Sequence, residues 1–316
     1  MAPPMAAAQG LDTTVHNPDS AFGNVKAGNW EVQISEITWG DKIGEGAMAA
    51  IYKAKLRGRE CVAKKLKTGV NAQTQAYKDL IMELEILTSV GQHPNLVEFY
   101  GACIQDSGSP IILEELVKGP NLEKFMVEKY DKFERSTIYG WSLDLVRALD
   151  FLHNRNPIII HRDLKPANLM LTGDYSTVKL ADFGMSKKVD ASQRDMVTHK
   201  GHTGTVRYMA PEVISQRTGN YTEKADIYSA ALIIWYIATG RRPAINDKNA
   251  LQDRPDLGLV EWQELSALIN IMWSQDPNIR PSAGDCIRTL ATMPGRPDLA
   301  QGTAPKHMKG GCCTIM

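Results

Sequence analysis

The alternation of hydrophobic and polar residues predicts a strand-rich first part of the chain. Alternating stretches at 51–55 and 60–65 flank Arg57-Gly58-Arg59, a pattern typical of a β-hairpin. Residues 77–90 instead gather their leucines on one face at helical spacing, which predicts an amphipathic helix. Shorter apolar stretches follow at 96–100 and 111–115, and each predicts a further strand.

After Gly119-Pro120 the pattern changes to that of helices. Apolar residues recur at steps of three and four, as on the buried face of a long helix. They are Ile138, Trp141, Leu145, Leu149 and Leu152. The sequence therefore predicts an α+β protein with two lobes: a small β-rich lobe with one key helix over 31–117, and a larger helical lobe over 118–294.

The two ends of the chain, 1–30 and 295–316, are expected to be flexible tails of a single domain over 31–294. A length of 316 residues with 43% apolar residues fits one large globular domain. The N-terminal tail, rich in alanine and proline, has the pattern of neither a secretory signal nor a transit peptide. The longest apolar run, 230–238, is too short to cross a bilayer.

Charge and cysteine content argue against two other classes of protein. Lysine plus arginine and aspartate plus glutamate both number 36, so no excess charge favours nucleic-acid binding. The 5 cysteines are odd in number and mostly scattered, which argues against a disulfide framework or a zinc cluster. We therefore expect a cytoplasmic protein without a nucleic-acid partner.

The most informative stretch is 161–169, His-Arg-Asp-Leu-Lys-Pro-Ala-Asn-Leu, which is followed by Ala181-Asp182-Phe183-Gly184. Phosphoryl transfer needs a carboxylate for the hydroxyl proton, a carboxylate and an amide oxygen for magnesium, and a cation for the transferred phosphate. The two strings contain these groups and resemble the catalytic and metal-binding loops of eukaryotic-type protein kinases. Either string alone would fit a surface pair or an ordinary turn, but both in this order rarely arise by chance.

This resemblance covers about 37–293 and implies a role for each of these groups. Asp163 would orient the substrate hydroxyl and accept its proton, and Lys165 would neutralise the γ-phosphate of ATP. Asn168 and Asp182 would hold Mg²⁺. A lysine at position 165 resembles serine/threonine kinases rather than tyrosine kinases.

A glycine-rich segment, Gly44-Glu45-Gly46, stands between two expected strands. Glycines let the backbone close over nucleotide phosphates, because a Cβ would obstruct the approach. Alone, two such glycines more often mark a tight turn, and Ala49 stands where the kinase pattern has its third glycine.

The resemblance of Val62-Ala63-Lys64-Lys65 to the kinase Val-Ala-x-Lys strand implies that Lys65 is the cation for the α- and β-phosphates. Lys64 would then point to the opposite face of the strand and be solvated. Glu83 on the following helix is expected to pair with Lys65, and Asp79, one turn earlier on the same face, is the alternative.

The same resemblance implies an adenine pocket between Ala63 and Met170, with Ile51 at its edge and Leu113 at its back. The segment that joins the lobes would be Glu114, Glu115 and Leu116. The complete set of residues expected to bind the nucleotide is Ile43, Gly44, Gly46, Ile51, Ala63, Lys65, Leu113, Glu114, Leu116 and Met170.

Two further segments resemble structural and regulatory parts of kinases. Glu212 would pair with Arg280 to secure the large lobe, and Asp226 would brace the backbone of the catalytic loop. Arg162 would bind a phosphate placed on Thr198 or Thr203 by an upstream activating kinase. Trp30-Glu31-Val32 ahead of Ile37 and Trp39 resembles the tyrosine-kinase-like group of kinases.

The last four residues, Cys313-Thr314-Ile315-Met316, fit a prenylation box, and Cys312 could carry a second acyl chain. Two such signals would support peripheral membrane association, because a single chain anchors weakly. The alternative is a chance tail, since Thr314 is not aliphatic.

The sequence thus predicts a serine/threonine kinase that transfers the γ-phosphoryl of MgATP to protein substrates. The alternative is a pseudokinase, which would keep the fold and signal by binding. The residues that separate the two are Lys65, Glu83, Asp163, Asn168 and Asp182, and all are present.

Overall fold

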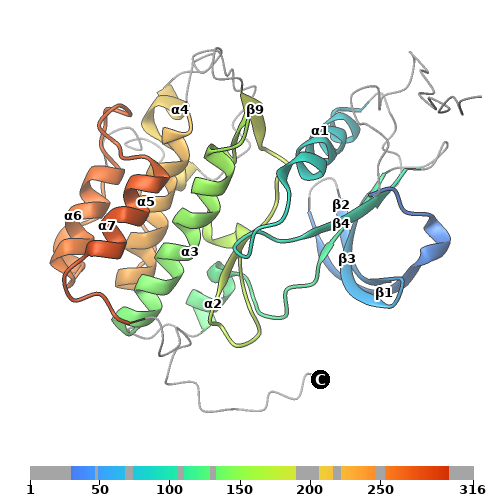
Figure 1. Ribbon diagram of the computed structural model, residues 1–316, viewed down its shortest axis with the longest axis horizontal. Helices are drawn as coiled ribbons and strands as arrows, with labels where there is room; N and C mark the ends of the chain where they lie inside the picture. The colour runs from blue at the N-terminus through green and yellow to red at the C-terminus, as the bar shows by residue number, and fades with distance from the viewer. Residues whose placement is uncertain are drawn as a thin grey trace, which may run out of the picture.

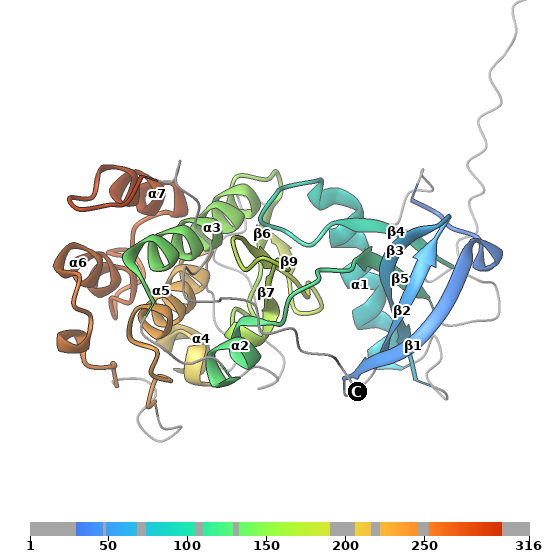
Figure 2. The ribbon, with the colours of Figure 1, turned by 90° about the horizontal axis from the view of Figure 1, so that it is seen from below.

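The computed structural model describes residues 30–46, 49–67, 74–104, 110–128, 133–189, 206–215, 222–245 and 253–298. These residues form two lobes that lie side by side along the long axis of the molecule (Figures 1 and 2). One lobe holds a β-sheet and one long helix, and the other is mainly helical. The predicted α+β class and two-lobed organisation are confirmed.

The small lobe is built on an antiparallel sheet with the strand order β1-β2-β3-β5-β4. Its strands are β1 (Ile37–Glu45), β2 (Ala49–Leu56), β3 (Arg59–Leu66), β4 (Phe99–Cys103) and β5 (Ile111–Glu115). The turn between β2 and β3 has Arg57 at φ 48° and Gly58 at φ 85°. Two left-handed residues match the right-handed twist of the flanking strands, so the expected hairpin forms.

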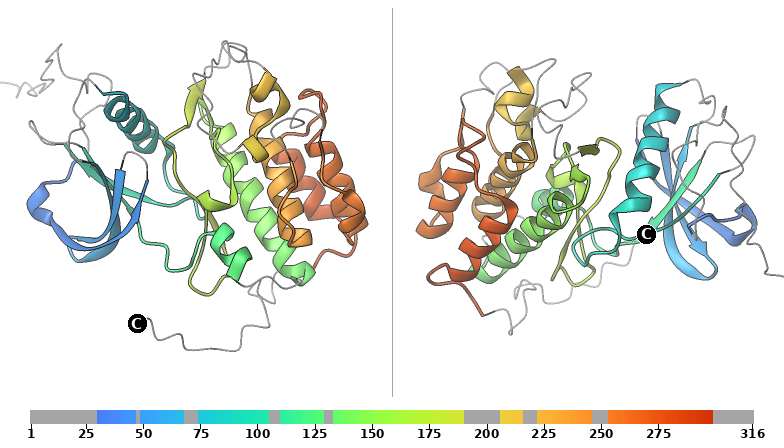
Figure 3. Two further views of the ribbon diagram at one scale, coloured as in Figure 1. Left: turned by 180° about the vertical axis from the view of Figure 1, so that it is seen from behind. Right: turned by 45° about the horizontal axis from the view of Figure 1, so that its top comes forward.

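Helix α1 (Gln75–Val90) lies on the side of the sheet that faces the large lobe (Figure 3). Thr74 begins the helix, because its hydroxyl accepts a hydrogen bond from the backbone N–H of Tyr77 at 3.3 Å. Leu80, Leu84 and Leu87 on the inner face are buried, as the leucine spacing predicted.

The register of the sheet decides which side chains face the large lobe. Ala63 of β3 stands opposite Leu113 of β5, whereas Val62 stands opposite Glu114. Because paired residues share a face, Ala63 and Leu113 lie together in an outer core of the small lobe. Val62 and Glu114 lie on the other face, toward the large lobe.

Residues 30–32 extend the sheet beyond β4. The N–H of Ala102 donates to the carbonyl of Trp30, and the N–H of Val32 donates to the carbonyl of Ala102, both at 2.9 Å. This close approach requires Gly101, which has φ 152°, because a Cβ there would lie 2.5 Å from the oxygen of Trp30.

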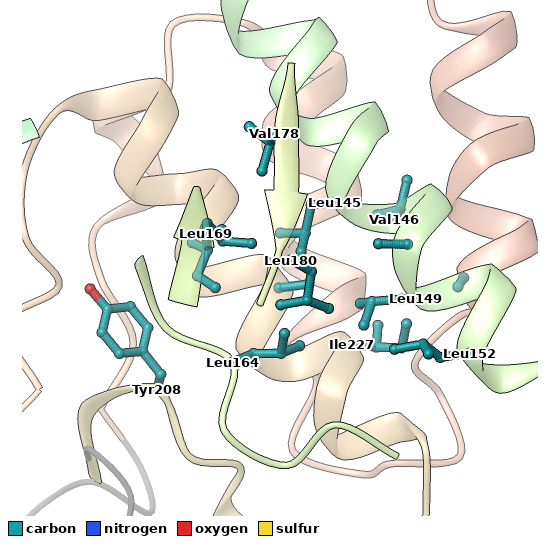
Figure 4. Close-up of a cluster of buried hydrophobic side chains, with 14 of the residues drawn as sticks. Leu145, Val146, Leu149, Leu152, Leu164, Leu169, Val178, Leu180, Tyr208 and Ile227 are labelled. Atoms are coloured by element: carbon teal, nitrogen blue, oxygen red, sulfur yellow. The ribbon is translucent and has the colours of Figure 1, made fainter. Parts of the chain in front are cut away.

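The large lobe is organised around two buried helices, α3 (Arg135–His153) and α5 (Lys224–Thr239). Figure 4 shows Leu145, Leu149 and Leu152 of α3 in the core that also contains Ile227 of α5. The apolar stripe predicted for α3 is therefore buried. Around these two helices lie α2 (Leu122–Glu128), β6 (Ile158–Ile160), β7 (Leu169–Leu171), β8 (Val178–Leu180), β9 (Lys187–Val189), α4 (Pro211–Ser215), α6 (Gln263–Met272) and α7 (Ala283–Thr292), with single 3-10 turns at Ile34–Glu36, Pro166–Asn168, Val206–Tyr208 and Leu257–Leu259. Within the ranges given above, no helix is long and apolar enough to span a membrane.

Candidate active site

The loop after β6 (Ile158–Ile160) is held by a buried carboxylate on α5. Asp226 accepts hydrogen bonds from the backbone N–H of His161 at 2.8 Å and of Arg162 at 2.9 Å, and it contacts the ring of His153 at 3.0 Å. Burial alone would raise the pKa of Asp226, but these hydrogen bonds outweigh burial and hold that pKa below its usual value. An ionised Asp226 therefore fixes the backbone immediately before Asp163, as expected.

The catalytic-loop side chains form one connected group. The ammonium of Lys165 lies 2.6 Å from the carboxylate of Asp163. The amide nitrogen of Asn168 donates to the backbone oxygen of Asp163 at 2.8 Å and to its carboxylate at 3.1 Å. Since the nitrogen of Asn168 is committed to Asp163, its amide oxygen points away from Asp163 and suits a hard cation.

A second group joins the two lobes through a lysine on β3. The ammonium of Lys64 lies 2.7 Å from both carboxylate oxygens of Glu83 on α1. It also lies 3.3 Å from the carboxylate of Asp182, which follows β8 (Val178–Leu180). Burial would lower the pKa of Lys64, but the negative charges of Glu83 and Asp182 raise it above its ordinary value. The lysine is therefore charged and held toward the cleft.

The prediction that Lys65 pairs with Glu83 is wrong. Lys65 is exposed on the opposite face of β3, where its ammonium lies 5.7 Å from the ring centroid of Trp39. Side chains alternate along a strand, and Cys61 and Ala63, which share the face of Lys65, are fully buried in the outer core. The alternative partner, Asp79, accepts a hydrogen bond from Gln75 instead.

A cleft of about 510 Å³ lies between the lobes and contains most of the predicted nucleotide-binding residues. The predicted residues that line it are Ile43, Gly44, Gly46, Ile51, Glu114, Leu116, Met170, Asn168 and Asp182. Glu115, expected in the segment that joins the lobes, also lines it. The residues that the sequence analysis missed are Ala49, Val62, Lys64, Val97, Val117, Gly119, Asn121, Ala167 and Ala181. The sequence did contain a signal for Val62 and Lys64. Val62-Ala63-Lys64 places an apolar residue two positions before a lysine, which is the same spacing as Ala63-Lys64-Lys65.

The predicted places of Ala63 and Leu113 in the cleft are also wrong. Both side chains are fully buried, but they lie together in the outer core of the small lobe and not in the cleft. Val62 takes the position over the cleft that was expected for Ala63, and Glu114 takes the position at its back that was expected for Leu113.

The large lobe is also secured by the predicted ion pair. Arg280 is almost fully buried, and its guanidinium contacts both carboxylate oxygens of Glu212 at 2.7 and 2.8 Å. The same guanidinium donates to the backbone oxygens of Ser274 and Lys224. A bidentate pair with two further donors directed at carbonyls offsets much of the cost of burying the charge.

Strand β9 (Lys187–Val189) connects the segment after Asp182 to α1. The ammonium of Lys188 donates to the backbone oxygen of Glu85 at 2.8 Å. Thr198 and Thr203 lie outside the described residues, as do Cys312 and Cys313, so the predicted phosphorylation and lipid attachment stay predictions.

The fold and these two connected groups define a bilobal phosphotransferase site. The family model described as "Protein kinase domain" matches residues 37–290, and the chain belongs to this family. This match confirms the resemblance on which the sequence analysis relied.

The chain is similar to several curated protein kinases. It is 36% identical over 272 residues to "Probable serine/threonine-protein kinase drkD" of Dictyostelium discoideum, covering 84% of this chain and 20% of the relative. It is 30% identical over 285 residues to "Serine/threonine-protein kinase VIK" of Arabidopsis thaliana, covering 83% and 61%. It is 33% identical over 264 residues to "Dual specificity protein kinase shkA" of Dictyostelium discoideum, covering 80% and 48%. The matched regions thus span between a fifth and about three-fifths of these relatives.

Proposed function

We propose that the chain is a protein serine/threonine kinase that transfers the γ-phosphoryl of ATP to hydroxyl groups of protein substrates. One observation carries the proposal. The Lys64–Glu83 pair from the small lobe reaches Asp182, which lines the same cleft as Asn168, and Asn168 is bonded to Asp163. A cation for phosphates, two metal-type ligands and a carboxylate base therefore line one continuous surface.

Each of these side chains has a distinct part in the proposed reaction. Lys64 binds the α- and β-phosphates of ATP, and Asn168 and Asp182 hold Mg²⁺, which neutralises phosphate charge when bound. Asp163 accepts the proton of the substrate hydroxyl as its oxygen attacks the γ-phosphorus. The bond from that phosphorus to the β-phosphate oxygen breaks, and ADP leaves. Lys165 stabilises the negative charge on the phosphoryl group during transfer.

The donor set fits a magnesium ion. Oxygen ligands from one carboxylate and one amide suit Mg²⁺, which usually retains waters and substrate phosphate oxygens as its other ligands. The side chain of Asp182 lines the cleft and is 46% exposed, so its carboxylate is accessible to a bound ion. The surrounding protein atoms would raise the pKa of Asp182 by desolvation, but the charge of Lys64 outweighs this effect and holds the pKa below its usual value, so the carboxylate is ionised and can bind a cation.

The rival function, a pseudokinase scaffold, gains no support from the geometry of the catalytic groups. The direct test is transfer of γ-labelled phosphate from MgATP to a generic basic protein and to the kinase itself, beside an Asp163→Asn variant. Magnesium-dependent label on serine or threonine that disappears in the variant is the expected result. Label on tyrosine would overturn the serine/threonine assignment, and no label with nucleotide binding retained would favour the scaffold.

We further propose that phosphorylation of Thr198 or Thr203 by an upstream kinase raises this activity. Arg162 supports the idea, because its position before Asp163 couples any phosphate bound there to the catalytic loop. The pKa of Lys187 on β9 is lowered mainly by burial and also by the positive charge of Arg162. The two residues therefore mark a region of positive potential beside the catalytic loop. A Thr198→Ala/Thr203→Ala protein with unchanged activity after treatment with an activating kinase would contradict the proposal.

A further inference from the structure

Glu114 places a carboxyl group at the back of the nucleotide cleft. It lies on β5, opposite Val62, and lines the cleft. Its Oε1 atom is buried and has no hydrogen-bond partner among the residues that the structure describes. The nearby ammonium of Lys64 is already directed at Glu83 and Asp182.

The neighbouring carboxylate, Glu115, does have partners, so position on this part of β5 does not by itself leave an acid unpaired. Glu115 lies 2.6 Å from the ammonium of Lys179 and accepts a hydrogen bond from the backbone N–H of Glu98 at 3.2 Å. Two adjacent glutamates therefore line one cleft, one satisfied by the protein and the other not. Burial raises the pKa of Glu114 to about 8, so near neutral pH the carboxyl is mostly protonated, and its carbonyl oxygen remains a hydrogen-bond acceptor.

Buried polar atoms without partners are rare, and those that persist commonly receive a partner from a ligand. We propose that Glu114 is a specificity-determining residue, whose unpaired carboxyl oxygen accepts a hydrogen bond from the exocyclic amine of the nucleotide base. A 6-aminopurine brings an N–H donor to this oxygen. A purine that lacks the 6-amino group brings no donor and leaves this oxygen unpaired.

This inference rests on the proposed function only in that the cleft binds a purine nucleotide, so binding rather than turnover is the decisive readout. The probes are ATP and purine riboside triphosphate with Mg²⁺, which differ only in the 6-amino group of the base. Their affinities are measured by displacement of a fluorescent nucleotide. The variants are Glu114→Met, which keeps the length of the side chain without an acceptor, and Glu114→Gln, which keeps an acceptor.

In Glu114→Met we expect the preference for ATP over purine riboside triphosphate to fall by roughly tenfold, because a site built to hydrogen-bond a ligand group discriminates against analogues that lack it. Glu114→Gln should retain most of the preference. Glu115→Gln is the matched control for the preference, because its carboxylate is already paired with Lys179. An unchanged preference in Glu114→Met would overturn the proposal.

Thermal unfolding of the nucleotide-free protein provides the second readout. Since Glu114→Met removes a buried acid that lacks a partner, the melting temperature should stay equal or rise. A clear fall would mean that the protein itself uses this carboxyl, and would also overturn the proposal. A different outcome is a protein that fails to transfer phosphate and still prefers ATP, with that preference reduced in Glu114→Met. That result would count against the kinase function and leave the role of Glu114 standing.

Discussion

The two adjacent lysines of β3 allow one prediction to be tested with a matched pair of variants. Lys64→Met should abolish most phosphoryl transfer, whereas Lys65→Met should leave it nearly unchanged. Both replacements remove one positive charge from neighbouring positions of one strand. They differ in the face of the sheet, because Lys64 contacts Glu83 and Asp182 and Lys65 lies over Trp39.

The expected magnitudes follow from these contacts. Loss of a single preorganised charge that stabilises a transition state costs roughly 100- to 1,000-fold in kcat, or about 3–4 kcal/mol. Without Lys64, the carboxyl of Glu83 would be a buried anion, and burial already raises its pKa. It should therefore take up a proton, which limits the loss of folding stability to roughly 1–3 kcal/mol. Loss of the exposed contact between Lys65 and Trp39 costs only about 0.5–1 kcal/mol.

The assay is initial-rate phosphoryl transfer at saturating and subsaturating ATP, with urea unfolding of each protein as the stability control. Lys64→Met should remain folded and lose kcat/KM by at least about 100-fold. The reasoning would be refuted if Lys65→Met lost activity to that extent while Lys64→Met kept it. Equal, modest losses in both would show that neither lysine contacts the phosphates.

Three further predictions concern the framework around the site. Gly101→Ala should destabilise the protein by roughly 1–3 kcal/mol in urea unfolding, because the added Cβ would lie 2.5 Å from the oxygen of Trp30; an unaffected midpoint would show that residues 30–32 do not dock in solution. Glu212→Ala and Arg280→Ala should each cost about 3–5 kcal/mol, and a double-mutant cycle should give strong coupling; additive losses would contradict a direct pair. Burial raises the pKa of Asp144 to about 6 from 3.8, so the folded state binds the proton of this group more tightly than the unfolded state does. The resulting contribution to the free energy of unfolding, about 3 kcal/mol, is lost as pH rises from about 4 to 6. Asp144→Asn should flatten the pH dependence of stability in that window, and an unchanged slope would refute the assignment.

The elements that sequence periodicity predicted well are those whose pattern depends on local geometry. The hairpin at Arg57-Gly58 needs only left-handed turn residues between alternating strands, and the inner face of α1 needs only leucines at helical spacing. The catalytic-loop residues lie together for a related reason. Asp163, Lys165 and Asn168 lie within six consecutive residues, so their mutual contacts are set locally.

Contacts across the sheet could not be predicted with the same certainty. The face of β3 that meets the large lobe depends on its register with β5, and register is a property of two strands far apart in sequence. The extension of the sheet by Trp30-Glu31-Val32 is likewise visible only once β4 is in place. The unpaired state of Glu114 could not be inferred at all, because it depends on what every neighbouring chain segment leaves unsatisfied.

The three corrected positions share one physical cause. A shift of one residue in a strand exchanges its two faces, so assigning Lys65 to the cleft also assigns Ala63 to it. Ala63 pairs with Leu113, and the same error therefore passes to β5 and puts Leu113 instead of Glu114 at the back of the cleft. Composition offered a way to detect it. Cys61 and Ala63 on one face are small and apolar, as a core requires, whereas a face with Lys64 and Glu114 has to meet water, a ligand or an opposite charge. The face that carries these charges was thus the functional face, and the same argument that corrects the lysine places in the cleft Glu114, whose Oε1 atom has no partner among the described residues.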